Sequence, residues 1–143
     1  RTDVAHARQD ARRGIRILIV DDNVDGADAL ARLLAVMGHE TATEYDGQSA
    51  LERVADFAPD VIFVDLGMPG MDGFQLCHRL RKHSLRNRPR IVALTGWGRE
   101  EDLARTAQAG FDAHLVKPVN RAVLERLLAE KARSSSSAAG AAA

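Results

Sequence analysis

The sequence "VIFVDLGMPGMDGF", residues 61–74, runs from a strand-like apolar segment into an acidic residue and then into a loop. Four apolar residues lead into Asp65, and Gly67, Pro69 and Gly70 follow it. A carboxylate at the end of a buried strand is costly to desolvate unless nearby groups compensate it. This stretch therefore predicts that other segments of the chain bring partners to Asp65.

Length, charge and cysteine content limit the class of protein. The 143 residues are enough for one domain, and 20 Lys and Arg balance 20 Asp and Glu. This balance gives no reason to expect contact with nucleic acid or with a membrane by this domain. The single cysteine, Cys77, cannot form an internal disulfide, and no His/Cys spacing resembles a zinc site. Together these features favour a reducing, cytoplasmic location.

The composition divides the chain into three parts. Residues 1–14 are polar with scattered alanines, and we interpret them as a linker or as the end of a preceding helix. Residues 15–132 contain all the apolar periodicity and form the expected domain. Residues 133–143 are rich in Ser and Ala and are expected to be a disordered, low-complexity tail.

Short apolar runs alternate with stretches of helical periodicity inside the expected domain. Strands are expected at residues 15–20, 40–44, 61–64, 90–94 and 113–116. Helices are expected at residues 24–37, 47–57, 73–83, 99–109 and 119–132. Five strand-then-helix units predict a doubly wound α/β fold, in which helices cover both faces of a parallel sheet.

Chemically capable side chains stand where four of these strands stop. They are Asp21 and Asp22 after the first strand, Asp65 after the third, Thr95 after the fourth and Lys117 after the fifth. In a parallel sheet these ends meet at one edge, where ligands bind. Three carboxylates at one edge raise each other's proton affinity unless a cation lies among them. The pattern predicts a site for Mg²⁺, or Mn²⁺, in which Lys117 and Thr95 hold a dianionic group against Asp65.

Each of these segments also has an ordinary structural interpretation. Asp21 and Asp22 are compatible with a turn or a helix N-cap, and Thr95 with a turn before Gly96. Lys117 is compatible with a surface lysine before a helix that starts near a proline. These interpretations do not explain why all the segments fall at the same edge of one predicted sheet.

Four segments in order resemble the signature segments of the receiver domain of bacterial two-component response regulators. They are "ILIVDDN" (17–23), "VIFVDLGMPGMDGF" (61–74), "VALTG" (92–96) and "LVKP" (115–118). The resemblance spans residues 15–132 and implies a CheY-like, flavodoxin-like (βα)₅ fold with strand order 2-1-3-4-5.

The resemblance also implies a phosphoryl-accepting metal site. Asp65 would take a phosphoryl group from a phosphohistidine as an aspartyl phosphate. Asp22 would be a direct Mg²⁺ ligand, and Asp21 an acidic neighbour acting partly through water. The backbone carbonyl of Gly67 would complete the protein ligands, and no organic cofactor is implied.

Three further positions correspond to the switch of the family. Thr95 would bond a phosphoryl oxygen in the active state. Lys117 would pair with the phosphoryl group, and its bond to Pro118 would be cis. His114 stands where the family commonly has an aromatic partner of the switch threonine. It is also compatible with a half-exposed strand residue.

The resemblance predicts a phosphorylation-switched signalling module rather than an enzyme. Its partner would be a histidine kinase or a histidine phosphotransfer domain, whereas the downstream partner is not specified. We favour the receiver segment of a hybrid sensor histidine kinase, because of "ALTGWG" (93–98), the non-Met start and the linker-like residues 1–14. A stand-alone single-domain regulator and the input half of a longer regulator are the alternatives.

Two other protein classes share parts of this pattern. A small phosphatase with an aspartate nucleophile also uses Mg²⁺ in a doubly wound fold, but its D-x-D pattern differs from Asp21, Asp22 and Asn23. A flavodoxin-like electron carrier would need a hydroxyl-rich phosphate cradle, which the first loop lacks. A colourless purified protein would exclude the electron carrier.

Overall fold

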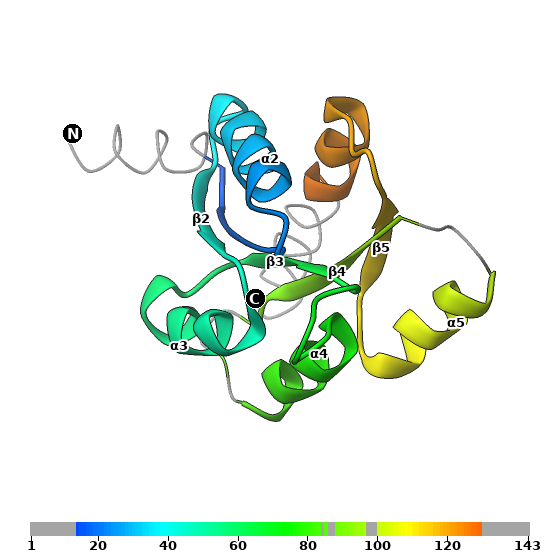
Figure 1. Ribbon diagram of the computed structural model, residues 1–143. Coiled ribbons are helices and arrows are strands. Elements are labelled where there is room, and N and C mark those ends of the chain that lie inside the picture. The colour runs from blue at the N-terminus through cyan, green and yellow to red at the C-terminus, as the bar shows by residue number, and fades with distance from the viewer. Residues whose placement is uncertain (1–13, 84, 86–87, 97–99, 130–143) are drawn as a thin grey trace, which may run out of the picture.

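The computed structural model describes residues 14–83, 85, 88–96 and 100–129, and in it five parallel strands form one sheet. The order of the strands is β2-β1-β3-β4-β5, as predicted (Figure 1). The strands are β1 (Arg16–Val20), β2 (Glu40–Glu44), β3 (Val61–Asp65), β4 (Arg90–Thr95) and β5 (Ala113–Val116). The helices are α2 (Val24–Val36), α3 (Gly47–Phe57), α4 (Gly73–Lys82) and α5 (Glu100–Ala109), with a C-terminal helix whose described part is 121–129.

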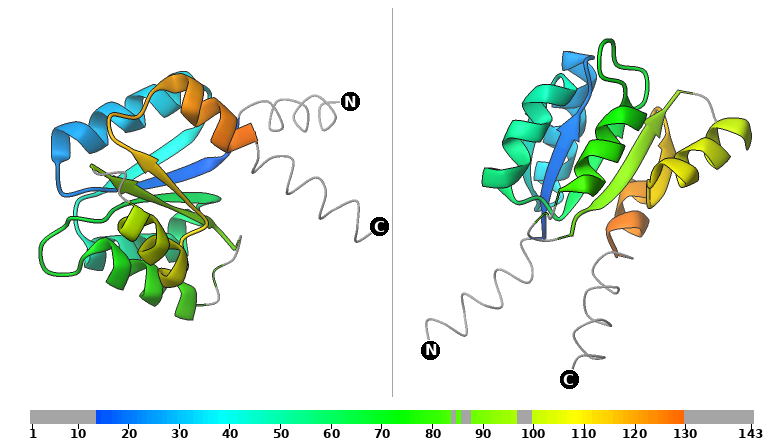
Figure 2. Two further views of the ribbon diagram at one scale, coloured as in Figure 1. Left: turned by 90° about the vertical axis from the view of Figure 1, so that its right-hand side faces the viewer. Right: turned by 90° about the horizontal axis from the view of Figure 1, so that it is seen from below.

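Helices cover both faces of the sheet. In Figure 1, α2 and the C-terminal helix lie on one side, whereas α3, α4 and α5 lie on the other. Figure 2 shows the sheet between these two layers when the molecule is turned. This arrangement confirms the doubly wound α/β fold that the alternating strands and helices predict.

Each face of the sheet has its own apolar core, because successive side chains of a strand point to opposite sides. On β1, Ile17 and Ile19 pack with Leu34 of α2 and with Leu124 of the C-terminal helix. Leu18, between them, packs against the layer of α3 and α4. The near-continuous apolar runs of β1, β3 and β4 follow from burial on both faces.

The expected boundaries that fall on described residues agree with the structure to within a few residues, whereas residue 99 and residues 130–132 of the expected helices lie outside the described residues. Asp65 and Thr95 are the last residues of β3 and β4 rather than the first residues beyond them. Helix α2 ends at Val36, one residue earlier than expected, because Met37 caps it and Gly38 takes a φ of +101°. The predicted linker lies outside the described residues except for Gly14, and the predicted tail lies entirely outside them.

The parallel register brings the ends of the strands to one edge. Val20 of β1 pairs with Val64 of β3, and Asp65 pairs with Leu94 of β4. The C-terminal ends of β1, β3, β4 and β5 therefore lie side by side. Within the described part of the chain, no helix is both long and apolar enough to cross a membrane.

Candidate functional site

Asp21 leaves β1 in a constrained turn that buries its carboxylate. The residue is 3% exposed, and its backbone N–H donates to the carbonyl of Glu44 at 3.1 Å. Its Oδ1 accepts from the backbone N–H of Asn23 at 3.0 Å. Asn23, rather than either aspartate, caps α2, because its Oδ1 accepts from the N–H of Gly26 at 3.2 Å. The capping interpretation of Asp21 and Asp22 is therefore wrong, and both carboxylates are left for the site.

Asp65 ends β3, and the loop that follows it leads into α4, whose first residues pack against the backbone of Asp65. A capping box starts this helix, in which Asp72 accepts from the N–H of Gln75 and the side chain of Gln75 accepts from the N–H of Asp72. The next residue, Gly73, packs directly beneath the site. A Cβ at this position would meet the backbone oxygen of Asp65 at 2.5 Å and the Cα of Leu66 at 2.8 Å. The backbone around Asp65 can approach α4 this closely only because Gly73 has no side chain.

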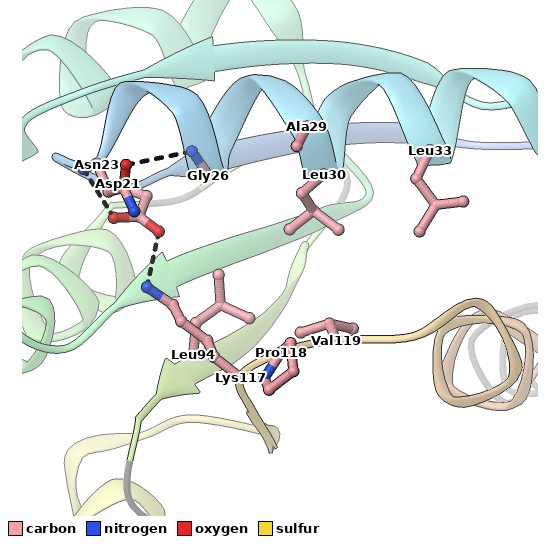
Figure 3. A pocket seen from close by; sticks show the side chains of 10 residues that line it. All are labelled: Asp21, Asn23, Gly26, Ala29, Leu30, Leu33, Leu94, Lys117, Pro118 and Val119. Atoms are coloured by element: carbon pink, nitrogen blue, oxygen red, sulfur yellow. Dashed lines mark hydrogen bonds and ion pairs between the residues drawn. The ribbon is translucent and has the colours of Figure 1, made fainter.

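Lys117 brings a cation from β5 to both buried carboxylates. Its Nζ donates to Oδ2 of Asp21 at 2.8 Å and to Oδ1 of Asp65 at 3.3 Å. Its backbone N–H donates to the carbonyl of Thr95 at 2.8 Å, which fixes the start of the loop. The peptide bond from Lys117 to Pro118 is cis, as predicted. Figure 3 shows the Lys117 side chain reaching Asp21 across the end of the sheet.

Asp21, Asp22 and Asp65 converge as a candidate metal centre. Each offers one carboxylate oxygen, and these oxygens lie within 4.8 Å of one another. Asp21 is buried, Asp65 is partly buried and Asp22 is exposed, so a cation would have protein on one side and water on the other. Hard oxygen donors with room for water suit Mg²⁺ or Mn²⁺. The residues present therefore fit such an ion.

The charges of the site are incompletely balanced. Burial raises the pKa of Asp65, the negative charge of Asp21 raises it further, and Lys117 acts in the opposite direction. Burial alone would lower the pKa of Lys117, but its hydrogen bond to Asp21 and the charge of Asp65 outweigh burial and raise this pKa. The side chain of Lys117 is therefore protonated at neutral pH. One ammonium group beside three carboxylates leaves room for a second cation.

The two predicted switch residues lie on neighbouring strands but differ in exposure. Thr95 ends β4 and is 5% exposed. His114, on β5, pairs in register with Ala93 of β4 and is exposed. The role of His114 in a switch therefore stays a prediction, as does the ligand role of the Gly67 carbonyl. Around Gly67 a Cβ would find no heavy atom within 4 Å, so this side of the site is open.

An apolar groove adjoins the site. It has a volume of about 460 Å³ and runs between α2 and the segment after Lys117. Asp21 and Lys117 line one end of it, and Leu30, Leu33 and Val119 line its apolar part (Figure 3). An apolar surface therefore leads directly to the charged site.

Sequence reasoning identified the charged residues of the site but not the residues that support them. It did not name Asn23 as the cap of α2, although an Asn just before a helical pattern is a recognised start signal. It also missed the capping box, for which Asp72 and Gln75 at a spacing of three were the available signal. The close packing of Gly73 against Asp65 depends on tertiary structure and has no such signal.

Residues 17–129 match a protein family described as the response regulator receiver domain. The chain is also similar to the protein PilG of Pseudomonas aeruginosa, with 31% identity over 76% of this chain and 80% of PilG. It is similar to the sensor histidine kinase RcsC of Salmonella typhimurium, with 35% identity over 84% of this chain but only 12% of RcsC. The transcriptional regulatory protein TcrA of Mycobacterium tuberculosis is 36% identical over 75% of this chain and 42% of TcrA.

Solved structures show the same fold. The chemotaxis protein CheY4 of Vibrio cholerae superposes with a TM-score of 0.76 and 30% identity, covering 82% of this chain and 98% of CheY4. The signal receiver domain of a signal transduction histidine kinase from Syntrophus aciditrophicus gives a TM-score of 0.72 and 31% identity, over 82% of this chain and 89% of that domain. Domains of this kind thus occur both as short chains and as parts of much longer ones.

Proposed function

Because this chain belongs to the family of response regulator receiver domains, which accept a phosphoryl group in two-component signalling, we propose that Asp65 is its phosphoacceptor. The observation that carries this proposal is the position of the Asp65 carboxylate. Its Oδ1 accepts from the ammonium group of Lys117 at 3.3 Å, and it offers an oxygen within 4.8 Å of oxygens of Asp21 and Asp22, at the end of the central strand. No other carboxylate of this cluster ends a strand in the middle of the sheet.

The chemistry is a single phosphoryl transfer. An oxygen of Asp65 bonds to phosphorus while the bond from phosphorus to the imidazole nitrogen of a phosphohistidine breaks, and the leaving imidazole takes a proton from solvent. Asp65 must be ionised to attack. Lys117 favours that state against the effect of burial, which raises the pKa of Asp65. Lys117 then remains close enough to pair with the transferred group.

Mg²⁺ is proposed as the resident ion, held by Asp21, Asp22, Asp65 and the carbonyl of Gly67. Receiver domains bind Mg²⁺ at an acidic pocket, and the three carboxylates here form such a cluster. When bound, the ion neutralises negative charge that builds up on the phosphoryl oxygens. The exposed position of Asp22 lets the ion enter from solvent without opening the fold.

The phosphodonor is a phosphohistidine on a histidine kinase or on a phosphotransfer domain. Receiver domains interact with proteins of these two kinds. The apolar groove beside Asp21 and Lys117 gives the donor a surface that is continuous with the acceptor site. We propose that a donor helix lies in this groove, against Leu30 and Leu33, while its phosphohistidine faces Asp65.

The response to phosphorylation is proposed to pass through Thr95. Its position at the end of β4, next in register to Val116 of β5, places it at the same edge as Asp65. Formation of a hydrogen bond from its hydroxyl to a phosphoryl oxygen would bias the domain toward an active state. His114 on β5 is proposed to change its packing in the same transition.

The parent protein is part of the proposal as well. The similarity to RcsC is consistent with the receiver segment of a hybrid sensor kinase, which we favour, and the similarity to PilG is consistent with a stand-alone regulator. In either case the domain would work in the cytoplasm, where phosphohistidine donors of this system act. The reading frame that surrounds residues 1–143 in the genome distinguishes these two architectures.

The direct test is to incubate the chain with Mg²⁺ and acetyl phosphate and to measure its intact mass. We expect the addition of one phosphoryl group that is labile to base and absent when EDTA replaces Mg²⁺. The variant Asp65→Asn should stay folded and gain no mass. A phosphatase would behave differently, with turnover of phosphate esters that is lost in Asp22→Ala and retained in Asp65→Ala.

A further inference from the structure

Charge is distributed very unevenly along this net-neutral chain. Residues 78–90, "HRLRKHSLRNRPR", contain six Arg and Lys and no acidic residue. Residues 21–60 contain ten Asp and Glu against two Arg. The second segment includes part of the phosphoacceptor site, whereas the first plays no part in the proposed function. The basic segment therefore needs an explanation of its own.

The described residues of the basic segment lead from α4 to the edge of the sheet opposite Asp65. Helix α4 begins at Gly73, which packs on the backbone of Asp65, and it ends before β4 begins at Arg90. Because the strands are parallel, the start of β4 lies at the far edge. The ten residues of α4 separate the two edges by about 15 Å.

Part of this charge has a structural use. Arg81 donates to the carbonyl of Gly110 at 2.9 and 2.8 Å and pairs with Asp112, which ties α4 to the loop before β5. Arg90 donates to the carbonyl of Leu127 at 3.4 Å. Cations in the last turn of α4 also interact favourably with the helix dipole. Hydrogen bonds and ion pairs therefore account for Arg81 and Arg90, whereas Arg79 and Lys82 have only the interaction with the helix dipole.

The remaining Arg and Lys residues that the structure describes in this segment, with two histidines beside them, form one exposed surface, which we call the basic patch. Its members are His78, Arg79, Lys82, His83 and Arg88, all of them exposed. On α4, Lys82 lies four residues after His78 and three after Arg79, so both are its neighbours on the helix surface. His83 and Arg88 line the same hollow, of about 340 Å³, beneath the end of α4. Among the carboxylates whose side chains the structure describes, none lies within ion-pair distance of Arg79, Lys82 or Arg88.

We propose that the basic patch binds an acidic segment of a partner protein. Arg79 and Lys82 of α4, with Arg88 beyond its end, pair with no carboxylate that the structure describes, and such a group of exposed cations complements a short run of Asp or Glu. The patch is at the opposite edge from Asp65, so the acidic partner and the phosphohistidine donor bind at the same time. The patch therefore gives the domain a second docking surface that phosphorylation chemistry does not occupy.

Two other anionic partners fit the structure less well. A nucleic acid duplex carries phosphates along its whole length, and α3, which packs against α4, has exposed carboxylates at Glu52 and Asp56 that would repel them. A membrane surface generally needs an apolar anchor in addition to basic residues. Among the described residues, the large apolar side chains that are exposed are Val24, Val36, Tyr45 and Val116, none of which belongs to the patch.

The test measures binding of a fluorescein-labelled polyglutamate peptide to the whole chain by fluorescence anisotropy, and maps the contact by amide NMR shifts. The patch variant replaces three patch cations by glutamine, and the matched control removes the same charge from exposed arginines elsewhere. The patch variant is Arg79→Gln, Lys82→Gln and Arg88→Gln. The control is Arg32→Gln, Arg121→Gln and Arg126→Gln. Amide spectra of both variants show whether they retain the fold.

We expect the wild type to bind at about 50 mM NaCl and to release the peptide at about 300 mM, because exposed charges are screened. Peptide-induced shifts should be centred on residues 78–83 and on Arg88. The patch variant should bind at least about fivefold more weakly, and the control should stay within about twofold of the wild type. Equal weakening in the control, or shifts centred elsewhere, would overturn the proposal. Tighter binding of duplex DNA or of phosphatidylglycerol vesicles than of the peptide would overturn the choice of partner.

Discussion

The ammonium nitrogen of Lys117 lies 2.8 Å from Oδ2 of Asp21, a contact that joins the end of β5 to the end of β1 across 96 residues of sequence. Because Asp21 is 3% exposed, this contact compensates a carboxylate that is almost removed from water. It also places a cation where the proposed metal ion would bind. The contact therefore links fold stability, metal affinity and the phosphoryl site.

The variant Lys117→Met tests this link. Without Mg²⁺, its free energy of unfolding should fall by about 1–3 kcal/mol, because Asp21 loses its charged partner. Its affinity for Mg²⁺ should equal or exceed that of the wild type, since a competing cation is gone. Urea unfolding and calorimetric titration measure the two quantities. Weaker Mg²⁺ binding in the variant would show that Lys117 does not compete with the metal.

Addition of Mg²⁺ should raise the stability of the wild type, because the ion binds only the folded arrangement of carboxylates. At a Mg²⁺ concentration of about 100 times its dissociation constant, the gain should be about 2.7 kcal/mol. Asp22→Asn should lose most of this gain in stability. Asp56→Asn, which changes an exposed residue of α3, should keep it. Thermal unfolding with and without Mg²⁺ measures the effect. If Mg²⁺ stabilised Asp22→Asn as much as it stabilises the wild type, Asp22 would not be a ligand of the proposed metal ion.

Two glycines near Asp65, the proposed phosphoacceptor, provide a matched pair of variants. Gly73→Ala should destabilise the fold by about 1–3 kcal/mol, because its Cβ would collide with the backbone of Asp65 and Leu66, which cannot rotate away. Gly67→Ala should change the stability by no more than about 0.5 kcal/mol, since open space surrounds it. Urea unfolding compares the two variants. Equal stabilities would mean that α4 does not depend on the close approach at Gly73.

His39 should make stability depend on pH. Its Nδ1 accepts from the backbone N–H of Ile15 at 3.1 Å, and burial lowers the pKa of His39. A lowered pKa means that the unfolded chain binds the proton more readily. The contribution of His39 to the free energy of unfolding is therefore fully present above the pKa of the unfolded state, near 6.5. It is lost as the pH falls through the lower pKa of the folded state.

His39→Gln provides the comparison for this effect, because glutamine does not titrate. Urea unfolding of wild type and variant should give a stability difference that shifts in favour of the variant as the pH falls below about 6.5. Carboxylates that titrate at lower pH affect both proteins alike and cancel in the difference. A stability difference that stays constant with pH would show that His39 does not titrate with unfolding.

The fold and the charged residues of the site were predictable because each depends on local sequence. The apolar runs of β1, β3 and β4 are buried on both faces, so their pattern is continuous, and each run ends in the polar residue that reaches the site. By contrast, the contacts of Arg81 with Gly110 and Asp112 span about 30 positions and leave no local pattern. Asn23 stands where a helix start signal is expected, but Asp is an equally good cap, so local sequence alone did not choose between Asn23 and the aspartates before it.

The central claim is that Asp65 carries the phosphoryl group, and chemical mapping tests it most directly. Borohydride cleaves an aspartyl phosphate and reduces its carboxyl carbon, which leaves homoserine at the modified position. The chain is therefore treated with acetyl phosphate and Mg²⁺, reduced with borohydride, digested and sequenced by mass spectrometry. We predict homoserine at position 65, dependent on Mg²⁺ and absent without acetyl phosphate. Homoserine at position 21 or 22, with unmodified Asp65, would contradict the account.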